Sequence, residues 1–444
     1  MSGGSNRFLE IACSNKTSDG KMSFRNGVSD LIFEIPEMNS TLIPGSVRVV
    51  GKLKVFKNAT GGGAVVGIGD DINLDARLGV YGAFQSLTTR SIRHQQSIES
   101  IRHYAHFLKS YLPLSTRTED NLGHLDEVSL TLPNWRLNKI ANVVRKDPKN
   151  TGNDFCVMLP CGLFSTNQDI PLSSNMLAGL EVRLALAPDS QVLYATDGTI
   201  ADTDCYYEFE DLKLVCEVRD YSESEIQQIM KQSEGVFTYN SVSSYYDTIN
   251  SSSASVVFNL GLSKVRSAFA TFIPSTFLNN LNQNGYSSLL PTNTGGTIAD
   301  VRKVTWTKGG SLYPKHYELN NVVRASPKTM ACDPVINRDY VSAVLPWSSN
   351  RATMISPWTN NRSWIADSKS TKQTIYTKVA DGGVIWGLGV NYDNLGGPGT
   401  DFSSQQWGMN IDLDLTTDNP ISTFVFVNSE QSVFFNQNGI QLKQ

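Results

Sequence analysis

The sequence predicts an all-β protein made of two domains. At 444 residues the chain is long for one typical domain and sufficient for two, each with a core of its own. Charged residues make up 18 %, below the roughly one quarter of ordinary soluble domains, and Ser, Thr and Asn are abundant. Apolar and polar residues alternate along many segments, which is typical of antiparallel strands with one buried face.

The clearest strand is GSVRVVGKLKVF at residues 45–56. Its alternation places four apolar side chains on one face and three basic ones on the other: Val47, Val49, Leu53 and Val55 against Arg48, Lys52 and Lys54. The same period of two recurs at 180–186, with Glu181 and Arg183 expected to point outward, and at 410–417.

The segment YYEFEDLKLVCEV at 206–218 changes phase in its middle. Tyr207 and Phe209 follow one alternation, whereas Leu212, Leu214, Cys216 and Val218 follow the opposite one. A slip of one residue within a strand is the effect of a β-bulge, which we therefore predict at Glu210–Asp211.

Few helices are expected. Apolar residues at helical spacing predict an amphipathic helix over 97–112, and Ser222 followed by Glu225 predicts a capping-box start for a helix over 222–232. A third short helix is expected at 275–281, after Pro274. Because the second helix lies near the midpoint, with strand patterns on both sides, we predict an N-terminal arm at 1–27, a first domain at 28–220, a helical linker at 221–235 and a second domain at 236–444.

Composition excludes several classes of function. A formal net charge of −4 argues against sequence-specific binding of nucleic acid. No apolar run reaches the roughly 18 residues of a transmembrane segment, and the first 20 residues lack a signal-peptide core. The six cysteines show no CxxC pairs, so we expect a reduced, intracellular chain.

The residues that carry chemistry form no convincing constellation. His103 and His106 have a spacing that can share a metal on a helix, but no third ligand follows at a fitting distance, and the wet face of the helix is favoured. Two acidic clusters, Asp70–Asp71 and Glu208–Glu210–Asp211, resemble a glycosidase pair only in residue type. We therefore expect no catalytic, cofactor-binding or metal-binding residue.

Glycine and tryptophan offer two further candidates. The glycine-rich stretches at 61–71 and 386–399 lack the phosphate-loop pattern and are expected to be surface loops. Tryptophans gather in the C-terminal half and could line a sugar site, although core or interface packing is favoured for them. They are Trp306, Trp347, Trp358, Trp364, Trp386 and Trp407.

Several segments, taken in order, resemble the double jelly-roll major capsid proteins of eukaryotic DNA viruses of the polinton-like virus, adintovirus and virophage type. The first is FEIP…LIPGSVRVVGKLKV, with Ile35, Pro36 and Pro44 at the marking positions. The second is the segment at 158–187, whose matching positions are Pro160, Gly162, Leu163, Pro171 and Leu172. The third is CYYEFEDLKLVCEV with the capped helix after it, and 262–274 and 311–321 resemble segments of the second roll.

The resemblance implies two consecutive eight-stranded antiparallel jelly rolls, with residues 30–56 as the first strand, loop and second strand. It also implies a structural, non-enzymatic protein that forms homotrimers, and these pseudo-hexameric capsomers would tile an icosahedral shell. The expected partners are further copies of the chain and minor capsid and vertex proteins. The expected location is the virion capsid, assembled in the host cytoplasm or nucleus. Loops around 58–75, 280–300 and 393–406 are expected to face outward and the arm inward. The alternative is a jelly-roll carbohydrate-binding protein or glycan hydrolase.

Overall fold

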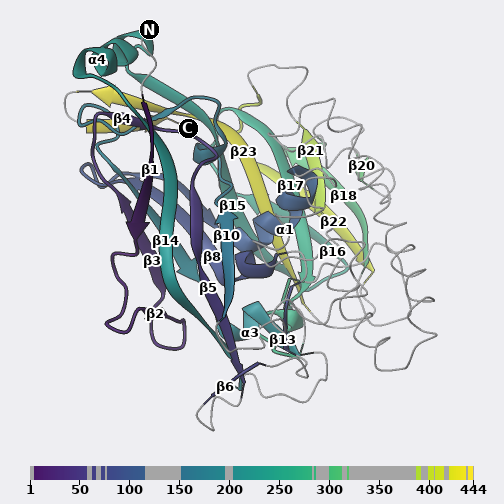
Figure 1. Cartoon of the computed structure of the whole chain (residues 1–444). Helices are drawn as coiled ribbons and strands as arrows, with labels where there is room; N and C mark the ends of the chain where they lie inside the picture. Colours follow the sequence, from purple (N-terminus) through teal and green to yellow (C-terminus); the bar gives the residue numbers. More distant parts are fainter. Residues whose placement is uncertain are drawn as a thin grey trace.

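A computed structural model describes residues 5–57, 63–66, 72–75, 78–115, 152–195, 204–282, 285–286, 300–312, 318–319, 387–391, 399–404, 406–414, 420–436 and 439–443. These residues lie mainly in antiparallel strands, which confirms the all-β prediction. The strands form two sandwiches, side by side in Figure 1, with helix α1 (Tyr104–Ser115) between them.

Eight strands build the first sandwich. They are β1 (Ser5–Ala12), β3 (Asp30–Ile35), β5 (Arg48–Lys57), β8 (Phe84–Ser91), β9 (Ser97–Arg102), β10 (Asn153–Met158), β12 (Leu180–Leu186) and β14 (Tyr206–Asp220). One sheet has the order β1-β14-β5-β10 and the other β3-β12-β8-β9. Short strands extend the first sheet or pair beside it: β2 (Lys21–Met22), β4 (Ser40–Leu42), β6 (Ala64–Val65), β7 (Ile72–Leu74), β11 (Ile170–Pro171) and β13 (Leu193–Ala195).

The second sandwich repeats this arrangement. Its strands are β15 (Val236–Ile249), β16 (Ser253–Phe258), β17 (Val265–Pro274), β18 (Asp300–Lys308), β19 (Ser311–Leu312), β20 (Glu318–Leu319), β21 (Gly387–Asn391), β22 (Trp407–Asp414), β23 (Ile421–Asn436) and β24 (Gly439–Lys443). One sheet has the order β15-β23-β17-β21, with β24 beside β23, and the other β16-β22-β18-β20, with β19 beside β18.

The two sandwiches share one topology. When β19 and β24 are set aside, the main strands of each half pair in the order first-eighth-third-sixth in one sheet and second-seventh-fourth-fifth in the other. This is the strand order of a jelly roll, in which two Greek keys wrap into facing sheets. We call the described residues before helix α4 (Glu223–Gln232) the first roll and those after it the second roll; every strand pair joins strands of the same roll.

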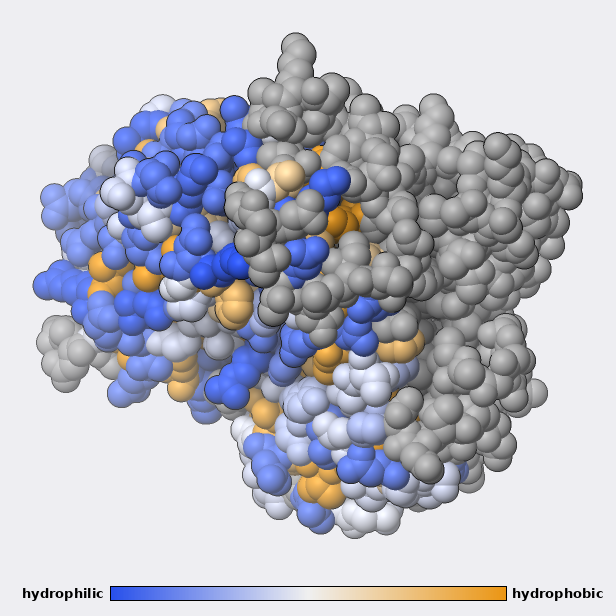
Figure 2. Space-filling view, turned by 90° about the horizontal axis from the view of Figure 1, so that it is seen from below, coloured by the Kyte–Doolittle hydropathy of each residue, from blue (hydrophilic) through white to orange (hydrophobic). Residues whose placement is uncertain are grey.

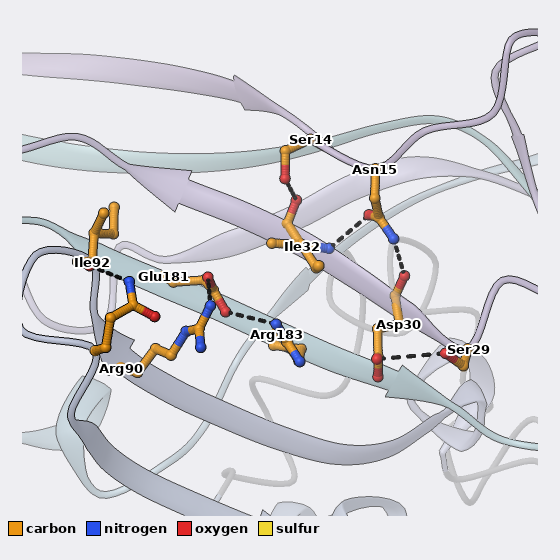
Figure 3. Close-up of polar contacts among 10 residues, drawn as sticks. Ser14, Asn15, Ser29, Asp30, Ile32, Arg90, Ile92, Glu181 and Arg183 are labelled. Carbon is orange, nitrogen blue, oxygen red and sulfur yellow. Dashed lines mark hydrogen bonds and ion pairs between the residues drawn. The ribbon is translucent and has the colours of Figure 1, made fainter.

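The strand predictions agree with burial. Val49, Leu53 and Val55 are buried on β5, and the bulge in β14 lies where it was predicted. The register of β14 against β5 shifts between Glu210 and Lys213, and Asp211 has φ of 53°. Glu181, predicted to point outward, is nevertheless buried, because Arg90 (2.6 Å) and Arg183 (3.3 Å) cover its carboxylate (Figure 3).

Two helix predictions need correction. Residues 97–102 form strand β9 instead of helix, since they pair with β8 and both Ile98 and Glu99 are buried. His103 then turns the chain with φ of 55°, and α1 begins at Tyr104. At 275–281 there is only the 3-10 turn η6 (Ser275–Phe277). The helix at 222–232 is confirmed as α4, with the predicted capping box between Ser222 and Glu225.

The predicted N-terminal arm contains a strand. Residues 5–12 form β1, which pairs with β14 along its whole length, so β3 is the second strand of the roll and not the first. The sequence pattern that would predict β1 is short, because Leu9 and Ile11 are the only residues of this strand that pack against the core. After β1, Asn15 fastens the chain to β3: its side chain donates to Asp30 O (2.7 Å) and accepts from the Ile32 N–H (3.1 Å) (Figure 3).

The junction between the rolls and the candidate interaction surfaces

The rolls meet where the edge strand β9 of the first lies against the edge strand β15 of the second. Tyr239 donates its hydroxyl hydrogen bond to Ile98 O (2.8 Å), and the Arg102 N–H donates to Ser244 Oγ (3.0 Å). Unpaired backbone groups at a sheet edge invite association with other chains. At this junction, side chains of one roll satisfy backbone groups at the edge of the other.

Glu99 is the central polar group of the junction. Its carboxylate is 2 % exposed and accepts hydrogen bonds from the backbone N–H groups of Gly162 (3.1 Å), Leu163 (2.9 Å) and Val242 (2.8 Å). Burial raises the pKa of Glu99, and the hydrogen bonds oppose this effect. Because Val242 belongs to β15, one carboxylate holds both rolls.

The backbones approach closely beside Glu99. A Cβ atom at Gly162 would lie 1.7 Å from Asn240 O on β15, far inside van der Waals contact. Only glycine fits at this position without moving one roll. Gly162, a position of the capsid-protein resemblance, is therefore required by the packing of the two rolls.

Aromatic side chains fill the junction around α1. Phe107 packs against Phe269 and Phe426, with ring centroids 6.2 and 5.5 Å apart. His106 stacks on Phe424 at 4.0 Å, and His103 stacks on Tyr246 at 5.3 Å. One continuous hydrophobic cluster includes buried residues of both rolls. The rolls therefore pack as one rigid unit.

The predicted wet face of the helix is wrong for His106, which is 6 % exposed. Burial lowers the pKa of His106 well below its usual value, with smaller contributions from Lys109 and His103. The two imidazole centroids lie 6.4 Å apart, and the described residues contain no group of three side chains able to hold a metal. Through their stacking on Tyr246 and Phe424, both imidazoles take part in the packing of the junction.

A second set of contacts joins the rolls near the loops. Gln191, on helix α3 (Asp189–Val192), donates to Gly285 O (2.9 Å) and accepts from the Asn279 N–H (3.1 Å). Tyr286, 1 % exposed, donates its hydroxyl hydrogen bond to Gly82 O. These contacts tie α3 and the 3-10 helix η2 (Gly79–Ala83) of the first roll to the segment that follows β17 in the second.

The other sequence candidates take structural places. Glu208 pairs with Lys21 (3.3 Å) and Glu210 with Lys54 (2.8 Å), and Asp70–Asp71 lie outside the described residues. Trp306 and Trp407 are buried in the second roll around Phe258, as the favoured prediction held. Trp347, Trp358, Trp364, Trp386 and most of both glycine-rich stretches lie outside the described residues.

A groove of about 340 Å³ lies between the rolls. Thr238, Asn240 and Arg266 are among its lining residues, and Glu430 is the single carboxylate among those that the structure describes there. Glu430 is ion-paired with Arg266 (2.8 Å) and Lys264. Glycosidic catalysis uses two carboxyl groups across the substrate, and the described lining residues of this groove supply one. In the view of Figure 2 the hydrophobic surface residues are dispersed among hydrophilic ones.

Two further findings concern thiols and membranes. Five cysteines of the described residues are free thiols: Cys13, Cys156, Cys161, Cys205 and Cys216. Cys332 lies outside that part. Among the described helices, none has the length and apolar character needed to cross a bilayer.

Several solved structures that superpose on this chain are viral capsid proteins. PBCV-1 VP54, as fitted into a reconstruction of the virophage Sputnik, superposes with a TM-score of 0.57 at 10 % identity, over 99 % of this chain and 97 % of VP54. The Faustovirus major capsid protein gives 0.55 at 8 % identity, over 98 % of this chain and 91 % of the other. The chain has the double jelly-roll fold of these proteins.

The mavirus major capsid protein gives a TM-score of 0.50 at 11 % identity, over 98 % of this chain and 90 % of the other. The predicted double jelly roll is thus confirmed. No family model matches the sequence, and no curated protein does. At such low sequence identity, the similarity to these structures shows that the chain shares their double jelly-roll fold, and it shows the fold alone.

Proposed function

We propose that this double jelly roll is a structural major capsid protein that forms homotrimers, and that these pseudo-hexameric capsomers tile an icosahedral shell. The observation that carries the proposal is the repeated strand order in two rolls that pack rigidly within one chain. Three such chains supply six similar bodies, enough for a ring of six-fold appearance. The similarity to viral capsid proteins over nearly the whole chain supports the same role.

The arrangement of the ends supports the expected orientation in a shell. In Figure 1 the N-terminus, the C-terminus and α4 lie near one end of the molecule, whereas β6, α3 and β13 lie at the opposite end. Of the three loops expected to face outward, those at 58–75 and 280–300 begin or end at that opposite end, since β6 belongs to the first and Leu281 accepts from the Ala195 N–H of β13. The described part of the third, at 393–406, lies instead beside the start of β17, where Thr400 pairs with Val265. We infer that the loops at 58–75 and 280–300 face outward and the N-terminus inward.

The remaining partners follow from the same proposal. The capsomers contact one another laterally, and minor capsid and vertex proteins complete the shell in the virion, assembled in the host cytoplasm or nucleus. No enzymatic role is proposed, since the junction groove has a single carboxylate among its described lining residues. The alternative, a glycan-binding or glycan-cleaving jelly roll, predicts a monomer.

Solution mass tests the proposal. Light scattering after size-exclusion chromatography is expected to give about three times the 48.9 kDa chain mass, stable to dilution. Electron micrographs of the same fraction are expected to show six-cornered rings. A monomer at all concentrations would overturn the capsomer, and a glycan-binding screen would then test the alternative.

A further inference from the structure

One sheet face of the second roll already serves as an interface. We use "outer face" for the side of a sheet that points away from the facing sheet of the same roll. On the outer face of the β15-β23-β17-β21 sheet, Phe269 and Phe426 pack on Phe107 of the first roll. Strand β15 of that sheet also covers the edge of β9, the fifth main strand of the first roll.

The equivalent face of the first roll belongs to the sheet β1-β14-β5-β10. Strand register places five apolar residues on it in neighbouring positions, interleaved with charged ones. The apolar residues are Phe8, Val50, Cys156, Met158 and Val215, and the charged ones are Glu10, Arg48, Lys213 and Glu217. We call this set the first-roll outer face.

Phe8 stands out on the first-roll outer face. Its side chain is 73 % exposed, whereas Val50, Cys156, Met158 and Val215 are half-buried. Of the charged groups beside it, Lys213 pairs with Glu10 (2.8 Å), and the Asn6 side-chain amide donates to the Glu217 carboxylate (2.8 Å). An exposed aromatic ring beside half-buried apolar residues and paired polar groups is the composition of a protein contact that an aromatic side chain anchors.

We propose that the first-roll outer face binds a second copy of this chain, at the end of its second roll formed by β18, β19 and β20. Within one chain, the outer face of the β15-β23-β17-β21 sheet of the second roll covers β9, the fifth main strand of the first roll. The proposed contact between copies would repeat this arrangement, with the first-roll outer face of one copy covering the fifth main strand of the second roll of the next. The fifth main strand of the second roll is β20. Leu312, on the adjacent β19, is 41 % exposed.

One chain cannot make this contact with itself. Strands β1 and β20 lie on opposite sides of the molecule in Figure 1. A head-to-tail contact between such ends closes a ring when the rotation between copies allows it. The inference rests on the proposed trimer, and it assigns the residues by which the trimer closes.

The first test uses Phe8→Glu and the double variant Phe8→Glu/Val215→Glu. Phe24→Glu is the matched control, because Phe24 is also exposed (37 %) and lies outside the first-roll outer face. We expect the double variant to fall from the trimer mass to 48.9 kDa at micromolar concentration with an unchanged strand signal in circular dichroism, and the control to stay trimeric. A trimeric double variant would overturn this surface and leave the capsomer standing, whereas a monomeric parent protein would overturn both.

Crosslinking provides a test that needs no substitution. An equimolar mixture of ¹⁴N- and ¹⁵N-labelled protein is treated with a lysine-reactive crosslinker and analysed by mass spectrometry. We expect mixed-isotope links between Lys213 of the first-roll outer face and Lys308 at the end of β18. If other mixed-isotope links form while those of Lys213 are absent, the trimer closes through another surface and the proposal is wrong.

Discussion

The carboxylate of Glu99 accepts a hydrogen bond from the backbone N–H of Val242, 2.8 Å away, and so joins the fifth strand of one jelly roll to the first strand of the other. The same carboxylate accepts from Gly162 and Leu163. Three backbone donors depend on one buried side chain. The relative placement of the rolls therefore depends on Glu99 more than on any surface ion pair, since exposed pairs contribute little.

Replacing Glu99 tests this dependence. Glu99→Ala leaves three N–H groups without their acceptor, those of Leu163 and Val242 in buried hydrogen bonds and that of Gly162 in a part-buried one; each orphaned buried donor costs about 1–3 kcal/mol, so we expect a loss of about 3 kcal/mol. Glu99→Gln retains one acceptor oxygen and is expected to lose less. Urea unfolding at fixed protein concentration measures both variants. Equal stability of Glu99→Ala and the parent would show that the junction does not rely on this group.

The pH dependence of Glu99 has a definite sign. Its pKa is raised in the folded protein, so its contribution favours folding at low pH and is lost as pH rises from 4.5 through the folded pKa. Glu99→Gln should remove this component from a plot of unfolding free energy against pH. An unchanged slope in that window would contradict the assignment.

Gly162→Ala tests the close approach of the two rolls. The added methyl group would meet Asn240 O at 1.7 Å, which forces backbone movement and should cost about 3 kcal/mol or more. Gly261→Ala is the matched control, because nothing lies within 4 Å of its added Cβ. Thermal unfolding should separate the two variants, with Gly261→Ala close to the parent. A Gly162→Ala protein as stable as the control would mean that the rolls can separate slightly without loss.

Local patterns in the sequence correctly predicted the structural features that depend only on residues close together in the chain. The phase change in 206–218 predicted the bulge in β14, and Ser222 with Glu225 predicted the start of α4. The repeated topology came from the resemblance, because strand partners such as β1 and β14 lie some 200 residues apart and leave no local signal.

The junction could not be predicted for the same reason. Glu99 lies in a segment whose apolar spacing fits a helix, and its acceptor role needs Val242 from the other half of the chain. His106 looked like a polar position because its aromatic neighbours, such as Phe424, come from distant strands. Strand β1 was not predicted because apolar and polar residues alternate only weakly along it. Its outward positions, which include Phe8, are exposed.

The bulge in β14 gives a paired prediction at Asp211, which is exposed and has φ of 53°. Asp211→Val places a β-branched residue in the left-handed region and should destabilise the fold by about 1–2 kcal/mol. Asp211→Gly relieves the strain but loosens the unfolded chain, so its net effect should stay within about 0.5 kcal/mol. Urea unfolding of both variants checks the difference, and equal stabilities would place the bulge at another residue.

Acid should loosen the junction through His106. Its folded pKa is depressed, so the stability that it contributes is complete above its ordinary value of 6.5 and is lost as pH falls below it. Burial is the largest cause of the lowered pKa values of His103 and His106, and the positive or titratable groups Arg102, Lys109 and His103 lower them further. Tyr286 and Phe424 from the second roll offer no negative charge to the imidazolium.

His106→Phe keeps a planar ring on Phe424 and removes the titration. We expect the thermal midpoint of the parent to fall between pH 7 and pH 5.5 more steeply than that of His106→Phe. Lys16→Gln, at an exposed position of the loop after β1, serves as the control for removing a basic group elsewhere. If the parent and His106→Phe lose the same stability over this range, acid acts on the fold through other groups and the buried imidazole is only a packing element.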